Sequence, residues 1–175
     1  MTVTVTVEVS ISDELATDAC ELSEDDVPEP VLLQAWAAAA YLGDTPAVVS
    51  LLVTTADEVQ SLNKQYRDKD KPTNVLSFPM QSPEEIDVSL LGDIVLCASV
   101  IKQEAQQQSK SELSHWAHMV VHGMLHLQGY DHIDNGDAEQ MEQLEIDILD
   151  QLGFASPYLE IIENNLLKKQ NESSE

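Results

Sequence analysis

The segment HWAHMVVHGMLHLQGYDH, residues 115 to 132, constrains the fold more than any other part of the chain. His122 and His126 stand four residues apart, so on a helix their side chains project from one face, about 6 Å apart along the axis. Apolar residues fill most of the other positions, which predicts that this helix is buried. Gly129 then lets the chain leave the helix in a conformation that most residues avoid, and this bend can bring His132 back to the same point.

Three neutral imidazoles that converge on one point, with a fourth position open, are typical of a catalytic zinc ion, because structural zinc sites usually close with four protein ligands. We therefore interpret His122, His126 and His132 as the ligands of one Zn2+ per chain. The alternative is that the histidines only pack within the core or cap the helix. The triplet and its intervening glycine favour the metal.

Two further histidines continue the same helical stripe, because His115 and His118 precede His122 at spacings that keep them on its face. His118 could pair with His122 in an alternative register. We prefer the downstream set, since only that set gains a third ligand through a glycine bend. His118 then serves in core packing or as a hydrogen-bonding partner of a ligand, and His115 in packing or capping. Asp131 and Asp93 could also orient a ligand or a water, with capping as the alternative.

Gly123 occupies the position at which zinc peptidases with the pattern H-E-x-x-H-x-x-G-x-x-H carry a glutamate that deprotonates the zinc-bound water. Peptide hydrolysis by that route is therefore disfavoured. A zinc ion held by neutral histidines keeps its full charge and suits reactions at phosphorus, which need charge stabilisation more than that glutamate. Arg67 is the best candidate for a cation beside the metal, because a guanidinium can bind a phosphate with two hydrogen bonds.

The charge balance is strongly negative, with 32 acidic and 8 basic residues and a formal charge of -24 at pH 7. Such a surface repels nucleic acid at long range. Half of the basic residues nevertheless lie in the segment KQYRDKDK, residues 64 to 71. This segment predicts a local anion site, with Arg67, Lys64 and Lys71 as substrate-binding residues. The alternative is an ordinary charged helix end followed by a charged loop.

Strand-like and helix-like patterns alternate along the chain. Strands are predicted at residues 2–10, 47–53, 75–78 and 90–97, helices at 28–43, 55–67, from 98, from 111 and at 134–153, and an acidic loop at 12–26. We expect an α+β fold, a single domain with a central mixed sheet of about four strands, helices on its faces and the histidine helix over the sheet. This domain should span residues 1–158, with residues 159–175 as a partly disordered C-terminal helix or tail.

Membrane and export signals are missing from the sequence as given. No run of about eighteen uninterrupted apolar residues is present, and the N-terminus lacks the basic start and apolar block of a signal peptide. Cys20 and Cys97 lie far apart and form no metal-type pair, which suits a reducing compartment. We therefore expect a cytoplasmic protein in which Cys97 is a small buried hydrophobe.

Three segments resemble the YbeY-type bacterial endoribonucleases, which are also called rRNA maturation factors. These segments are NKQYRDKDKPTNVLSFP (63–79), LLGDIVLC (90–97) and HWAHMVVHGMLHLQGYDH (115–132), within a likeness that runs from about residue 48 to residue 158. The resemblance implies a zinc-dependent, single-strand-specific endoribonuclease that acts in ribosomal RNA maturation and ribosome quality control. It also implies the same three histidines as metal ligands and Arg67 as a functional arginine.

The acidic surface leads us to expect that single-stranded ribosomal RNA either makes short, local contacts with the basic segment 64–71 or is delivered by a partner, such as a ribosomal protein or a ribosome-associated GTPase. Two rival functions stay open. A zinc peptidase or amidohydrolase would use the same metal. A non-enzymatic, metal-stabilised ribosome assembly factor would hold the metal for structure only.

Overall fold

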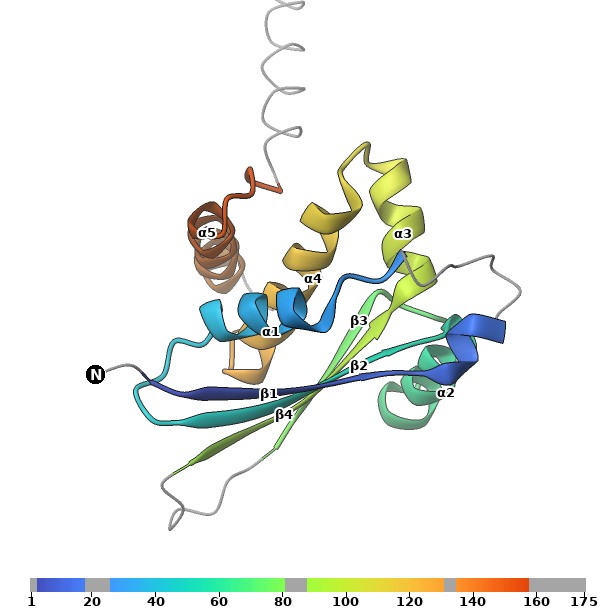
Figure 1. The fold of residues 1–175 in the computed structure, drawn as a ribbon, viewed down its shortest axis with the longest axis horizontal. Coiled ribbons are helices and arrows are strands. Elements are labelled where there is room, and N and C mark those ends of the chain that lie inside the picture. The colour runs from blue at the N-terminus through green and yellow to red at the C-terminus, as the bar shows by residue number, and fades with distance from the viewer. Residues whose placement is uncertain (1–2, 18–25, 81–87, 131–134, 158–175) are drawn as a thin grey trace, which may run out of the picture.

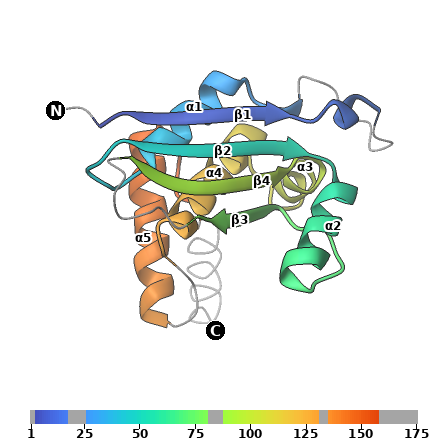
Figure 2. The ribbon, with the colours of Figure 1, turned by 90° about the horizontal axis from the view of Figure 1, so that it is seen from below.

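A mixed sheet of four strands forms the centre of the molecule, as described by a computed structural model for residues 3–17, 26–80, 88–130 and 135–157. Its strands are β1 (Val5–Ile11), β2 (Ala47–Thr54), β3 (Val75–Pro79) and β4 (Ser89–Cys97). Their order is β1-β2-β4-β3, and β1, β2 and β4 run parallel. The short strand β3 pairs antiparallel with β4 and forms one edge of the sheet (Figure 2).

Five α-helices accompany the sheet in the described residues. They are α1 (Pro30–Ala39), α2 (Ala56–Arg67), α3 (Ala98–Gln107), α4 (Glu112–Leu127) and α5 (Asn135–Gln151). Helices α1, α4 and α5 lie on one side of the sheet and α2 on the other (Figure 1). The expected α+β fold, with a mixed sheet and a histidine helix over it, is confirmed. None of these helices combines the length and the apolar character that crossing a bilayer requires.

Helix α4 is the centre of the larger core. Trp116, Met124 and Leu125 on this helix are at most 1% exposed. They belong to one apolar cluster with Ile94 of β4 and Met141 of α5, so the histidine helix is packed between the sheet and the last helix. A smaller cluster lies under α2 on the opposite face; its buried members are Val59, Leu76, Val95 and Cys97. The expected burial of Cys97 is confirmed.

Local sequence signals set the helix ends. The Thr55 hydroxyl accepts a hydrogen bond from the Glu58 main-chain N–H at 3.3 Å, which starts α2 as the capping-box spacing predicts. Helix α1 begins at Pro30, two residues after the predicted start at Pro28, and ends at Ala39, before the predicted end at Gly43. The reason is tertiary, because the Leu42 N–H donates to the Gln128 side chain at 2.8 Å instead of continuing the helix.

The acidic stretch after β1 differs from the expected loop. Residues Asp13–Thr17 form a 3-10 helix, η1. Leu15 within it is 7% exposed and belongs to the larger core, so one apolar residue holds this acidic segment against the fold. The rest of the stretch, from residue 18 to residue 25, and the predicted tail at 159–175 lie outside the described residues.

Candidate functional site

The two helical histidines meet through their outer ring nitrogens. His122 and His126 project from one face of α4, as their spacing predicts, and their Nε2 atoms are 2.9 Å apart. Both side chains line a cavity of about 450 Å3 at the edge of the sheet. Two imidazole nitrogens directed at one point of a cavity form half of a tetrahedral metal site.

The glycine bend after α4 has the geometry that the sequence predicts. Gly129 has a φ of +98°, in the region that favours glycine, and the Tyr130 N–H donates back to the Leu125 carbonyl at 3.1 Å. Gly129 and Tyr130 also line the cavity, so the chain that leads to His132 starts from its wall. Residues 131–134, with both Asp131 and His132, lie outside the described part of the chain.

A buried carboxylate holds two of the histidines from behind. Glu145 of α5 has no exposed surface, and its two oxygens contact His118 Nε2 and His122 Nδ1, each at 2.7 Å. Burial by itself raises the pKa of Glu145. The hydrogen bonds from His118 and His122 outweigh that effect and hold the pKa well below its ordinary value. Glu145 is therefore ionised and acts as a hydrogen-bond acceptor only.

This contact determines where His122 carries its proton. Because an ionised carboxylate only accepts, the Nδ1 atom of His122 donates to Glu145. In the neutral ring, Nε2 then directs a lone pair toward the cavity and accepts a hydrogen bond from the Nε2 proton of His126, with the two nitrogens 2.9 Å apart. A metal ion that replaced this proton would find both Nε2 atoms as ligands, with His122 oriented by a carboxylate as is common for metal-bound histidines.

Glu145 is not among the site residues predicted above, although the sequence contains a signal for it. Met141, Leu144 and Ile148 mark the apolar face of the last helix, and Glu145 follows Met141 by four residues on that same face. An acidic residue within an apolar stripe is unusual unless a partner compensates it, and the histidine stripe of α4 offers that partner.

Two placements of a metal are compatible with the described residues. The ligand atoms of His118, His122 and Glu145 lie within 4.8 Å of one another and form a group that could hold a metal ion. The other placement uses the Nε2 atoms of His122 and His126. The second is favoured because these two histidines line the cavity with Arg67, whereas Glu145 is closed off from solvent.

Arg67 reaches the same cavity from the other side of the sheet. It is the last residue of α2, and its Nη2 donates to the main-chain carbonyl of Ser77 on β3 at 2.5 Å. Its guanidinium carbon also lies 5.8 Å from the ring centroid of Phe78, within cation–π range. Among the described residues that line the cavity, Arg67 is the one with a permanent charge.

The other basic residues of the predicted anion site do not line this cavity. Lys64 is exposed, and its ammonium lies 3.8 Å from a carboxylate oxygen of Asp70. Lys71 is also exposed, and its main-chain carbonyl accepts a hydrogen bond from Asn63. The structure therefore brings Arg67, and not the lysines, to the histidines.

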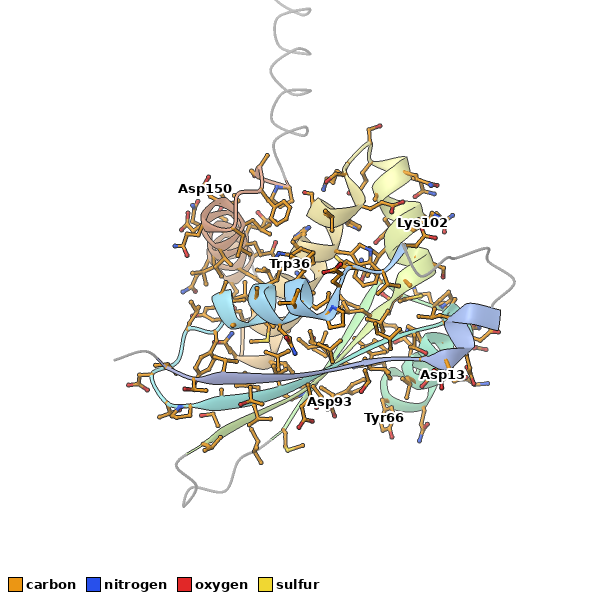
Figure 3. All side chains as sticks on the ribbon, viewed as in Figure 1. Asp13, Trp36, Tyr66, Asp93, Lys102 and Asp150 are labelled. Carbon is orange, nitrogen blue, oxygen red and sulfur yellow. The ribbon has the colours of Figure 1, made fainter. Side chains whose placement is uncertain are left out.

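Two further candidates lie apart from the cavity. The His115 ring is 3% exposed, and its Nε2 lies 3.1 Å from a Glu104 carboxylate oxygen that also accepts from Asn74. Burial lowers the pKa of His115, and the Glu104 hydrogen bond opposes this only in part. Asp93 projects from the opposite face of the sheet, where it and Tyr66 line a second cavity (Figure 3). Asp93 is therefore not placed to orient a ligand among the histidines.

Gly123 faces the sheet and not the cavity. A Cβ atom built on this glycine would lie 3.0 Å from Cγ2 and 3.2 Å from Cδ1 of Ile94, closer than ordinary packing allows. Any side chain at this position would therefore be directed into the interface between α4 and β4. The residue that replaces the peptidase glutamate is a packing glycine, which removes the basis for that type of peptide hydrolysis.

Comparisons with known proteins identify the family that this chain resembles. The profile of the family described as "Endoribonuclease YbeY" matches residues 23–153, so the likeness begins earlier than the motifs alone indicate. A protein of Alteromonas mediterranea with that name is 53% identical over 79% of this chain and 89% of its own length. One from Colwellia psychrerythraea with the same name is 55% identical over 64% of this chain and 72% of its own. A solution structure from Thermotoga maritima aligns with a TM-score of 0.47 at 23% identity, over 84% of this chain and 91% of that one.

Proposed function

The chain belongs to the YbeY endoribonuclease family, and we propose that its cavity cleaves single-stranded ribosomal RNA with a zinc ion held by His122, His126 and His132. The observation that carries this proposal is the meeting of Arg67 with the His122 and His126 rings in one cavity. One element provides nitrogen ligands and another a permanent cation. Both would favour phosphodiester cleavage, because negative charge accumulates on the reacting phosphoryl group.

The described donor set fits a zinc ion. The Nε2 atoms of His122 and His126 are close together, and the ionised Glu145 fixes His122 in the tautomer that a metal requires. When bound, zinc supplies a Lewis acid for a phosphoryl oxygen and lowers the pKa of a coordinated water. His132 is proposed as the third ligand because Gly129 turns the chain at the wall of the cavity.

Arg67 binds and positions the scissile phosphate in this proposal. Its contact with the Ser77 carbonyl and with Phe78 leaves further guanidinium N–H donors for two phosphate oxygens. The attacking group is either the neighbouring 2′-hydroxyl of the RNA or a water molecule. The first route leaves a 2′,3′-cyclic phosphate, and the second leaves a simple phosphate monoester, so the cut ends distinguish them.

Delivery by a partner follows from the charge of the protein. At a formal charge of -24, this chain gains little from long-range attraction to RNA. We infer that a ribosomal protein or a ribosome-associated GTPase presents the RNA. On this hypothesis, binding to a free RNA fragment is weak and tightens when ribosomal components are added. Equally tight binding to naked RNA would contradict the delivery step but not the nuclease.

The decisive experiment measures cleavage of a single-stranded ribosomal RNA fragment by metal-quantified protein. Wild type is compared with Arg67→Ala, His126→Ala and the matched control Lys64→Ala, which removes a cation from the same last turn of α2. We expect wild type and Lys64→Ala to hold about one zinc and cut, Arg67→Ala to keep its zinc and fold but not cut, and His126→Ala to lose zinc.

Two results would change this conclusion. If Arg67→Ala and His126→Ala both cut as wild type does, the activity comes from a contaminant and the proposal fails. If Lys64→Ala loses as much activity as Arg67→Ala, the basic segment acts through its overall charge, and the specific role of Arg67 fails. Circular dichroism of each variant shows whether a loss reflects unfolding.

A further inference from the structure

The outer edge of β3 forms part of the cavity wall. The Cys97 N–H donates to the Asn74 carbonyl and the Met80 N–H to the Leu91 carbonyl, and these two pairs continue, at either end, the register that runs from Val75 opposite Leu96 to Pro79 opposite Gly92. Main-chain groups of an antiparallel strand alternate between the partner strand and the free side. The main-chain N–H and C=O groups of the even-numbered residues of β3 therefore point toward β4. Those of Val75, Ser77 and Pro79 point to the free side of the strand, apart from the N–H that proline lacks.

One main-chain donor of β3 remains available on that outer side. The Val75 N–H donates to the Asn74 side chain at 2.7 Å, and Pro79 has no N–H. The β3–β4 register directs the Ser77 N–H away from β4, and among the described residues no hydrogen bond outside the strand ladder involves it. Ser77 lines the cavity, so this N–H is the donor that the strand can present to a ligand there.

Arg67 stands beside this donor because it is bound to the same residue. The N–H and C=O of one residue in a strand point to the same side, and the Ser77 carbonyl accepts from Arg67 Nη2. A neutral amide donor and a guanidinium are thereby directed at one place. Together they match a phosphate group, whose oxygens accept several hydrogen bonds at once.

We propose that the Ser77 N–H and the Arg67 guanidinium hold one phosphate of the RNA, so that the substrate strand lies along the outer edge of β3. This inference rests on the proposed function and adds the position and direction of the substrate. The cavity, of about 450 Å3, falls in the range of small-ligand sites and receives part of one strand, not a paired duplex. A preference for single-stranded over double-stranded RNA then follows from the position of the RNA along the edge of β3.

The proposal is tested by removing one N–H without removing a charge. Ser77→Pro eliminates the N–H and the hydroxyl, whereas Ser77→Ala eliminates only the hydroxyl, so their difference reports on the N–H. Proline is suited to this position because the N–H faces away from β4, as at Pro79 of the same strand. Replacing residue 77 by lactic acid, which turns the amide into an ester, removes the N–H without the bulk of a proline ring.

The readout is the dissociation constant of a short single-stranded RNA on metal-depleted protein, measured at several salt concentrations. We expect Ser77→Pro and the ester variant to bind about 10-fold more weakly than Ser77→Ala, since a hydrogen bond to a charged group is lost. Their salt dependence should equal that of wild type. Arg67→Ala, by contrast, should reduce the slope of log Kd against log salt concentration by the amount that corresponds to about one phosphate contact.

The outcomes separate this inference from the proposed function. If wild type neither binds nor cleaves RNA, the proposed function fails. If wild type binds and cleaves but the folded ester variant binds as tightly as Ser77→Ala, the edge-strand inference alone is overturned. Should Ser77→Pro fail to fold, the ester variant decides the question, because it keeps every side chain of the Ser77→Ala protein.

Discussion

The hydroxyl of Ser77 donates a hydrogen bond to the main-chain carbonyl of Gly123 at 3.3 Å. This contact joins the edge strand, which anchors Arg67, to the helix that carries His122 and His126. Both partners are buried, so the hydrogen bond forms away from bulk water. The distance between the cation and the histidines is thus set by a direct link between their supporting elements.

Removal of this link should weaken the fold modestly. We expect Ser77→Ala to lower the free energy of unfolding by about 1 kcal/mol, because one buried hydrogen bond is lost. Denaturation in urea measures the change. Ser89→Ala is the control, since the Ser89 hydroxyl meets Thr45 in an exposed contact at 2.9 Å and should contribute less than about 0.5 kcal/mol. Equal losses in the two variants would contradict a specific link between β3 and α4.

Glu145→Gln should weaken metal binding while leaving the metal ligands in place. The change keeps the volume but removes the ionised acceptor that orients His122, and we expect zinc affinity to fall by about 10- to 100-fold. Competition with a chromophoric chelator measures this. Glu139→Gln, at an exposed position of the same helix, is the matched control and should bind zinc as wild type does. An unchanged affinity for Glu145→Gln would mean that this carboxylate does not position the ligand.

His118→Asn and His126→Ala distinguish the two placements of the metal. If zinc binds between His122 and His126, then His126→Ala should lose most of its zinc, and His118→Asn should keep it with affinity reduced by at most about 10-fold. The opposite pattern would place the metal on His118, His122 and Glu145. Metal analysis after gel filtration, with circular dichroism as a check on folding, gives the answer without an activity assay.

Gly123→Glu should destabilise the protein without creating a peptidase. The new side chain would be directed at Ile94 in a dry interface, and we expect a loss of about 3 kcal/mol or more in unfolding free energy. Leu113→Glu adds the same side chain at an exposed position in the first turn of α4 and should change stability by less than about 0.5 kcal/mol. Zinc-dependent cleavage of a peptide library by folded Gly123→Glu would show that position 123 reaches the metal after all.

The buried ring of His115 should make stability depend on pH. Burial lowers its pKa in the folded state below the ordinary 6.5, with His118 and Lys110 acting in the same direction and Glu104 against them. The unfolded chain therefore binds more protons near and below pH 6.5. The stabilising contribution of neutral His115 is complete above that pH and is lost as the pH falls.

Unfolding free energies of wild type and His115→Gln, measured between about pH 5.5 and about pH 7.5, check this sign. The advantage of wild type over the variant should shrink toward the acidic end. Because the other histidines titrate in both proteins, the difference isolates His115. A constant difference across the range would show that the His115 pKa is not lowered.

The sequence predicts those parts of the molecule that depend on local patterns. The spacing of His122 and His126, the bend at Gly129 and the cap at Thr55 all act within a few residues, and the structure reproduces each of them. Contacts between distant segments could not be predicted from the sequence. Glu145 lies 23 residues after His122, and the outward direction of the Ser77 N–H depends on the register between β3 and β4.

The lysines show the limit of composition as a guide. Lys64 and Arg67 share the last turn of α2 and are equivalent by charge, yet only Arg67 lines the cavity. The difference arises because β3 passes close to the end of α2, where the Ser77 carbonyl accepts a hydrogen bond from the Arg67 side chain. Tertiary contacts decide which of these residues enters the cavity, and these contacts cannot be predicted from the charges of the segment.

The arginine and the histidines rest on separate hydrophobic clusters on opposite faces of the sheet. The small cluster under α2 supports Arg67, and the large cluster around α4 supports His122 and His126. Damage to the small cluster can therefore displace the arginine while the large cluster and the histidines stay intact. If zinc binds at these histidines as proposed, full zinc occupancy would then coexist with an inactive enzyme, so a purified sample is judged by its turnover and not by its metal content.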